Sequence, residues 1–193
     1  MHQIENALAA AAMALARGLD LDAVADGLTD ARPPSEWRME LHDRVDGAAV
    51  INDAYNANPE SMAAALSLLR GIRGQAGRRT IAVLGEMFEL GDGAVSAHRQ
   101  VGAAAAAADV DVLLTIGEMA AHMAAAATEQ GAWRGEAIVT AGRGEAIDWL
   151  RQNVAAGDVV PVKASRGAAL ELVAEALLDP PLDDTTAEGS STR

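Results

Sequence analysis

The chain has 193 residues, of which half are hydrophobic but only 3% are aromatic, so its core must be built mainly from Ala, Leu, Val, Ile and Met. A formal net charge of −13 argues against nucleic acid or an anionic membrane surface as the main partner, and the lack of cysteine excludes disulfides, thiol nucleophiles and Cys-based metal sites. With no apolar run of the ~18 residues needed to span a membrane and no secretory signal, we expect a soluble, cytoplasmic protein.

The first 28 residues predict a helical hairpin. Apolar residues at positions 4, 8, 11 and 15 recur at helical spacing up to Gly18, and a second short helix is expected from Asp20 to Leu28. Residues 29–37 contain two prolines among polar residues and predict a linker. We therefore expect a helical segment at 1–28, a linker at 29–37, a second domain at 38–179 and a disordered tail at 180–193.

Strands and helices alternate along the second domain. Residues 38–43 and 48–53 predict two strands joined around Asp46-Gly47, a hairpin signal. Further strands are expected at 79–84, 111–116, 137–140 and 158–163, with helices after Pro59 and at 94–108, 118–128, 145–154 and 168–178. This alternation predicts an α/β fold, a mostly parallel sheet with helices on both faces.

A polar turn follows the second of these strands and is the first candidate site. Asp53, Tyr55, Asn56 and Asn58 lie between the apolar strand and the next helix, which Asn58 can cap with Pro59 at its first position. In open α/β sheets, ligands bind at the carboxyl ends of the strands. The alternative is that these residues only form a turn and a cap.

Lys163, Ser165 and Arg166 form the second candidate site, because they follow the apolar strand at 158–163 and precede a helix. Their cations should lie at the same sheet edge as Asp53, where they can bind carboxylate or phosphate oxygens. A solvated basic turn is the alternative. In the amino-terminal helix, the amide of Asn6 can recognise the edge of a base.

Other catalytic patterns find little support. The chain contains no G-x-x-x-x-G-K-[ST] loop and no G-x-S-x-G motif, and the glycines of 85–93 lack the G-x-G-x-x-G spacing. The four histidines, including His98, show no metal-ligand spacing, so we expect no metal site in this chain.

Five blocks, in the same order, resemble motifs of the ATP-dependent Mur ligases of peptidoglycan synthesis. They are residues 2–10 (HQIENALAA), 38–40 (RME), 52–62 (NDAYNANPESM), 83–91 (VLGEMFELG) and 162–166 (VKASR). The block containing Tyr55 is the most specific, and it favours the members that add D-alanyl-D-alanine to UDP-N-acetylmuramoyl-tripeptide.

The resemblance implies that this chain corresponds to only part of a ligase. The family has three domains, and this chain resembles a helical remnant of the central ATPase domain, the hinge and the Rossmann-like carboxyl-terminal domain. The complete enzyme would use ATP and Mg²⁺ to form an acyl phosphate that the amine of D-alanyl-D-alanine attacks. Because the P-loop, the Mg²⁺ ligands and the amino-terminal domain are missing, we expect the chain alone to be inactive.

The resemblance also assigns roles to residues. Asn6 would meet the adenine, Arg38 the nucleotide and Asp53 the ribose, whereas the substrate-binding set would be Tyr55, Asn56, Asn58, Lys163, Ser165 and Arg166. Gln3, Trp37 and Asn52 depart from the usual family residues. Two alternatives stay open: a fragment of a folylpolyglutamate synthase-like ligase, and a nucleotide- or acceptor-binding module without catalysis.

Overall fold

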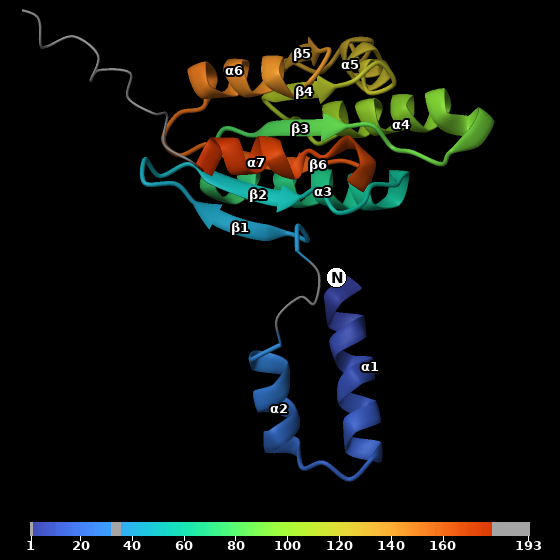
Figure 1. The fold of residues 1–193 in the computed structure, drawn as a ribbon, viewed down its shortest axis with the longest axis vertical. Helices are drawn as coiled ribbons and strands as arrows, with labels where there is room; N and C mark the ends of the chain where they lie inside the picture. Colours follow the sequence, from blue (N-terminus) through green and yellow to red (C-terminus); the bar gives the residue numbers. More distant parts are fainter. Residues whose placement is uncertain (1, 32–35, 179–193) are drawn as a thin grey trace, which may run out of the picture. The chain divides into compact units, whose positions relative to one another are not determined.

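The computed structural model describes residues 2–31 and 36–178 and divides the chain into two compact units, Met1–Ser35 and Glu36–Arg193. The first unit is the predicted pair of helices, α1 (His2–Ala16) and α2 (Leu21–Thr29) (Figure 1). Asp20 caps α2 by accepting a hydrogen bond from the N–H of Ala23 (2.8 Å). The predicted tail at 180–193 and the centre of the predicted linker, 32–35, lie outside the described residues.

A six-stranded sheet forms the centre of the second unit, in the order β1-β2-β6-β3-β4-β5. Its strands are β1 (Glu40–Asp43), β2 (Ala49–Asp53), β3 (Ile81–Gly85), β4 (Val112–Ile116), β5 (Glu136–Thr140) and β6 (Val159–Lys163). β1 pairs antiparallel with β2 through the expected hairpin, and all other pairs are parallel. The predicted mostly parallel α/β fold is confirmed.

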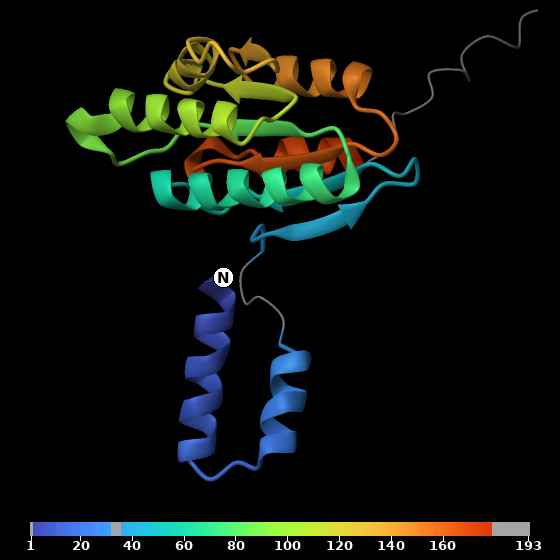
Figure 2. The ribbon, with the colours of Figure 1, turned by 180° about the vertical axis from the view of Figure 1, so that it is seen from behind.

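Helices cover both faces of this sheet (Figures 1 and 2). One face packs against α3 (Pro59–Ala76), α4 (Ala94–Ala107) and α5 (Ala121–Thr128), and the other against α6 (Arg143–Asn153) and α7 (Glu171–Leu178). Short helical turns, η1 (Gly91–Gly93) and η2 (Arg166–Ala168), precede α4 and α7. The strands β3, β4 and β6 are buried along their whole length because both of their faces are covered.

Of the elements that begin later than predicted, three do so for a clear local reason. β1 begins at Glu40, not Arg38, because Met39 has a φ of 51°, which an extended strand does not allow. α7 begins at Glu171 because Ala169 (φ 52°) ends η2 in the left-handed region. α5 begins at Ala121 because residues 117–120 form a turn instead.

The connections define where a ligand can enter. The helices that follow β2 and β3 lie on one face of the sheet, whereas α7, which follows the intervening strand β6, lies on the other. Such a switch leaves a crevice at the carboxyl ends of the strands. The segments after β2 and β6, which carry the two candidate sites, lie at this switch. Within 2–31 and 36–178, no helix has both the length and the apolar character needed to cross a membrane.

Candidate functional site

The turn after β2 is held by its own polar side chains. Asn58 caps α3 in a reciprocal capping box: its Oδ1 accepts from the N–H of Ser61 (2.8 Å), and Ser61 Oγ accepts from the N–H of Asn58 (3.1 Å). Pro59 occupies the start of the helix, as predicted. Asn56 Oδ1 accepts from the N–H of Ala57 (2.8 Å). The capping function of Asn58 is therefore confirmed.

An ion pair joins the two candidate sites. Asp53 and Lys163 are paired across the parallel strands β2 and β6, and Lys163 Nζ lies 2.7 Å from Asp53 Oδ2. The same ammonium donates to the carbonyl of Asn56 (2.9 Å). The expected proximity of Asp53 and Lys163 is confirmed, but Lys163 is only 3% exposed and is not the solvated cation of a basic turn.

Ser165 connects the turn after β2 with the loop after β3. Its Oγ accepts from the N–H of Phe88 (3.0 Å) and donates to the carbonyl of Ala57 (3.4 Å). Its backbone N–H donates to the carbonyl of Glu86 (3.0 Å). Because Ser165 is buried and its hydroxyl both donates and accepts, the residue holds the edge of the site together.

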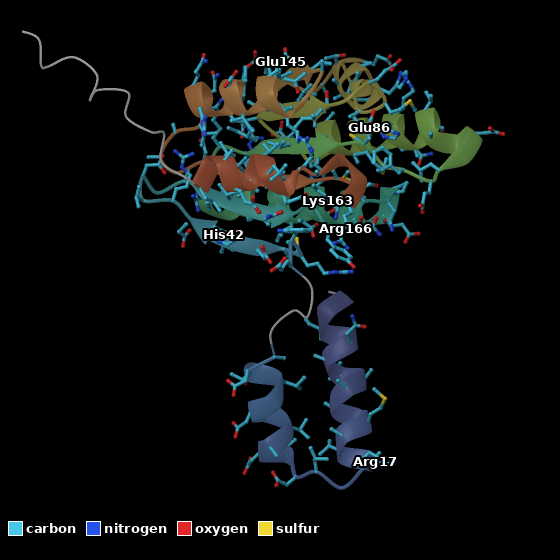
Figure 3. The ribbon with its side chains drawn as sticks, in the orientation of Figure 1. Arg17, His42, Glu86, Glu145, Lys163 and Arg166 are labelled. Carbon is cyan, nitrogen blue, oxygen red and sulfur yellow. The ribbon has the colours of Figure 1, made fainter. Side chains whose placement is uncertain are left out.

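Two exposed arginines lie on aromatic rings beside this pair. The guanidinium carbon of Arg38 lies 4.2 Å from the centroid of the Tyr55 ring, and that of Arg166 lies 5.4 Å from Tyr55 and 5.7 Å from Trp37. These distances suit cation–π contacts. Figure 3 shows Lys163 and Arg166 close together at one end of the sheet. Arg38, Arg166 and Tyr55 therefore meet at this edge. The two motifs predicted this for Tyr55 and Arg166, whereas the position of Arg38 beside them comes from the structure.

Trp37 is a neighbour of the site whose contacts sequence reasoning missed. Its φ of 60° is rare for a bulky residue, and its conformation is held by two hydrogen bonds, from its N–H to Glu40 Oε1 (2.7 Å) and from the N–H of Tyr55 to its carbonyl (3.1 Å). No local pattern signals such a contact. The only sign was that Trp37 departs from the family residue.

Glu86 and His98 shape the loop after β3. Glu86 Oε1 accepts from the N–H of Met119 (2.9 Å) and so fixes the turn before α5. His98 is fully buried, with Nε2 accepting from the N–H of Met87 (3.0 Å) and Nδ1 next to the carbonyl of Ala94 (2.7 Å), which assigns the proton to Nδ1. The position of Glu86 directly after a buried strand was the available signal for its role.

The remaining predicted residue, Asn6, lies in α1 and is exposed. It belongs to the first compact unit, whereas the other candidate residues belong to the second. Across the two described segments, no three His, Asp or Glu side chains are placed to hold a metal ion.

A hollow of about 690 Å³ lies away from the candidate site, by the residues that precede β3 and β4. It is lined by Arg70, Arg73, Arg78 and Arg79 together with Asp109 and Asp111. Several of these arginines have internal partners: Arg73 pairs with both aspartates, and Arg78 donates to the carbonyls of Gly157 and Asp158. We therefore interpret these arginines as stabilising the loops around this hollow, not as a ligand site.

A parallel sheet with a carboxylate, an ammonium and two guanidinium groups at its switch point defines a Rossmann-like domain suited to an anionic ligand. Residues 37–166 match the family model described as Mur ligase, glutamate ligase domain. The chain belongs to the Mur ligase family.

Its relatives include named ligases. The chain is 44% identical over 199 residues to the UDP-N-acetylmuramoyl-tripeptide--D-alanyl-D-alanine ligase of Mycobacterium bovis, and 37% identical over 180 residues to that of Escherichia coli. These matches cover 95% and 91% of the chain but only 38% and 37% of the relatives. A crystal structure of MurF from Acinetobacter baumannii superposes with a TM-score of 0.76 at 25% identity, covering 93% of this chain and 38% of that one. The chain therefore spans about two fifths of the length of these relatives.

Proposed function

We propose that the chain forms the carboxyl-terminal part of an ATP-dependent, cytoplasmic ligase that joins D-alanyl-D-alanine to UDP-N-acetylmuramoyl-tripeptide in peptidoglycan synthesis. The observation that carries this proposal is the arrangement at the sheet edge, where Asp53 and Lys163 lie beside Arg38, Tyr55 and Arg166. The names of the relatives above support it.

We assign the ribose and the phosphates of the nucleotide to Asp53 and Arg38 of the second unit. The adenine contact that the resemblance implies for Asn6 is a separate proposal for the first unit. An aspartate can accept hydrogen bonds from ribose hydroxyls, and an exposed guanidinium matches phosphate oxygens. Arg38 is exposed, and Asp53 retains part of its surface next to Lys163.

The acceptor peptide is assigned to the neighbouring turn and the segment after β6. Arg166, together with Tyr55 and Asn56, would face the acceptor, while Asn58, Lys163 and Ser165 shape its surroundings. A dipeptide carries a carboxylate, and Arg166 is an exposed cation that can bind it.

In this proposal the domain contributes positioning and electrostatics. The exposed guanidinium groups would hold anionic groups in line, and the fixed turn would orient the acceptor amine toward the acyl phosphate. Magnesium would neutralise phosphate charge in the complete enzyme. Since the described residues offer no cluster that could hold Mg²⁺, we propose that other domains supply its ligands.

The first test uses the pure chain. Mixed with ATP, Mg²⁺, UDP-N-acetylmuramoyl-tripeptide and D-alanyl-D-alanine, it should release no phosphate and bind nucleotide weakly at most. Turnover by the pure chain would contradict the proposal that the ATPase machinery lies elsewhere.

The second test joins the chain to the remaining part of the Mycobacterium bovis relative. The fusion should form the amide product, and Asp53→Ala should raise its KM for ATP by about tenfold or more, since a hydrogen bond to a charged group contributes ~1.5–3 kcal/mol. Asp43→Ala is the matched control, because Asp43 is an exposed carboxylate at the far end of β1. A fusion that instead adds glutamate to a folate would support the folylpolyglutamate synthase-like alternative.

A further inference from the structure

Lys163 is the most enclosed charged group of the candidate site. Its side chain is only 4% exposed, and its Nζ donates to Asp53 Oδ2 (2.7 Å) and to the carbonyl of Asn56 (2.9 Å). An ammonium has three N–H donors, so two of them are already committed to the protein. Very little of Lys163 is left for a ligand to contact.

The partners of Lys163 belong to segments that surround the site. Asp53 is the last residue of β2, and its other oxygen, Oδ1, accepts from the N–H of Met39 (3.3 Å), directly before β1. Asn56 lies in the polar turn, two residues before Asn58, which caps α3. One ammonium therefore connects the end of β2, the polar turn and the segment that carries Arg38.

The stem of Lys163 fits this task. It lines a narrow pocket together with Ile51, Leu69 and Pro161, so apolar neighbours restrict where the ammonium can go. A lysine ammonium is a compact donor that can satisfy a carboxylate oxygen and a carbonyl at once, whereas the longer arginine fork suits bidentate, exposed anions. The exposed Arg166 three residues later has the properties of a ligand-binding cation.

We propose that Lys163 is a positioning residue: it aims the carboxylate of Asp53 and fixes the turn through Asn56, and it affects the ligand only through them. This differs from the substrate contact that the family resemblance implies for Lys163. The inference rests on the proposed function where it concerns the nucleotide, but its structural part can be tested without any ligase activity.

The structural test measures amide hydrogen exchange in the whole chain by NMR. In Lys163→Met, the amides of Met39 and Tyr55 should exchange at least about tenfold faster than in the parent. The N–H of Met39 donates to Asp53, and Tyr55 lies between Asp53 and Asn56, the two residues that the ammonium holds. Amides of the buried strand β4 should keep their relative protection. Unchanged exchange at Met39 and Tyr55, or no protection there in the parent, would overturn the proposal.

A matched control separates positioning from stability. Asp158→Asn removes the partner of Arg79 in another ion pair, 3.3 Å long, where the aspartate directly precedes β6 at the end opposite Lys163. It should lower the midpoint of unfolding and leave exchange at Met39 and Tyr55 unchanged. If Lys163→Met does not fold, the double variant Lys163→Met/Asp53→Asn replaces it, because it buries no unpaired carboxylate. In this variant the amide of Tyr55 should still exchange faster than in the parent.

A kinetic test in the fused ligase distinguishes positioning from direct contact. Lys163→Met should raise the KM for ATP by the same factor as Asp53→Asn, and the double variant should be no worse than either single variant. Because the ammonium also holds the turn through Asn56, the KM for D-alanyl-D-alanine should rise in Lys163→Met as well. A KM for ATP that is higher in the double variant than in either single variant would show that Lys163 contacts the nucleotide independently of Asp53, and would overturn the proposal. A fusion without ligase activity would count against the proposed function and leave the exchange result standing.

Discussion

Among the glycines compared in the second unit, Gly102 leaves the least room for a side chain. It lies in α4, and a Cβ built on it would be 2.0 Å from the carbonyl oxygen of Met123 at the start of α5. Because the atom in the way is backbone, no side-chain rotation relieves the contact. Gly71 in α3 offers a matched control, since its Cβ would meet nothing within 4 Å.

The two substitutions to alanine should have opposite effects. Replacing a helical glycine by alanine gains about 1 kcal/mol of helix propensity, so Gly71→Ala should stabilise the unit by ~0.5–1 kcal/mol. Gly102→Ala gains the same propensity but must push α5 away from α4, and overpacking costs ~1–3 kcal/mol. Since the propensity term cancels between the variants, their difference isolates the clash. With contact at 2.0 Å we expect a difference of about 2–3 kcal/mol, in the upper part of that range.

Urea unfolding followed by tryptophan fluorescence measures this difference. All three tryptophans, Trp37, Trp133 and Trp149, lie in the second unit, so the signal reports that unit alone. A difference of 2–3 kcal/mol corresponds to roughly 4–12 °C in the melting temperature for a domain of this size. Equal midpoints for Gly102→Ala and Gly71→Ala would refute the close approach of α4 and α5.

Two further predictions concern turns. Asn58→Ala removes the acceptor of the Ser61 N–H and should destabilise the second unit by ~1 kcal/mol in the same urea assay, whereas Asn58→Asp should retain most of the stability. The N–H of Ala48, together with Arg44, holds the pKa of Asp46 below its ordinary value. The ionised carboxylate of Asp46 therefore stabilises the hairpin fully at pH values above the ordinary pKa of an aspartate. This stabilisation is lost as the pH falls through the lowered pKa of the folded state. The difference in unfolding midpoint between the parent and Asp46→Asn should disappear in acid; a difference that grows in acid would contradict this.

Features set by neighbouring residues were predictable from the sequence. Asn58 and Pro59 act within one helical turn, and Asp46-Gly47 lies in the connection between two paired strands, so composition and spacing were sufficient. The meeting of Asp53 and Lys163 was also predictable, although 110 residues separate them, because parallel strands end at the same edge.

Features set by non-local packing were not predictable. The left-handed conformations of Trp37 and Met39 are held by Tyr55, Glu40 and Asp53, and a local sequence pattern does not reveal these contacts. For this reason the predicted start of β1 was wrong. For Glu86, the position after β3 was visible in the sequence, but its partner Met119, which follows the next strand, was not. Apart from Glu40, the residues that make these contacts are distant in the chain.

The segment from Lys163 to Arg166 shows how four adjacent residues acquire different roles. Lys163 still belongs to β6 and is paired on both sides, with Asp53 of β2 and Leu84 of β3, so its side chain must lie within the sheet's packing. Ala164 joins the core under α7, while Ser165 is tied to the loops after β2 and β3. Only at Arg166, in η2, has the chain left the sheet, and there the cation is exposed. In the sequence alone, Lys163 and Arg166 look like equivalent cations. Because β6 ends between them, Lys163 is buried and positions the site, whereas Arg166 is exposed and can bind a ligand.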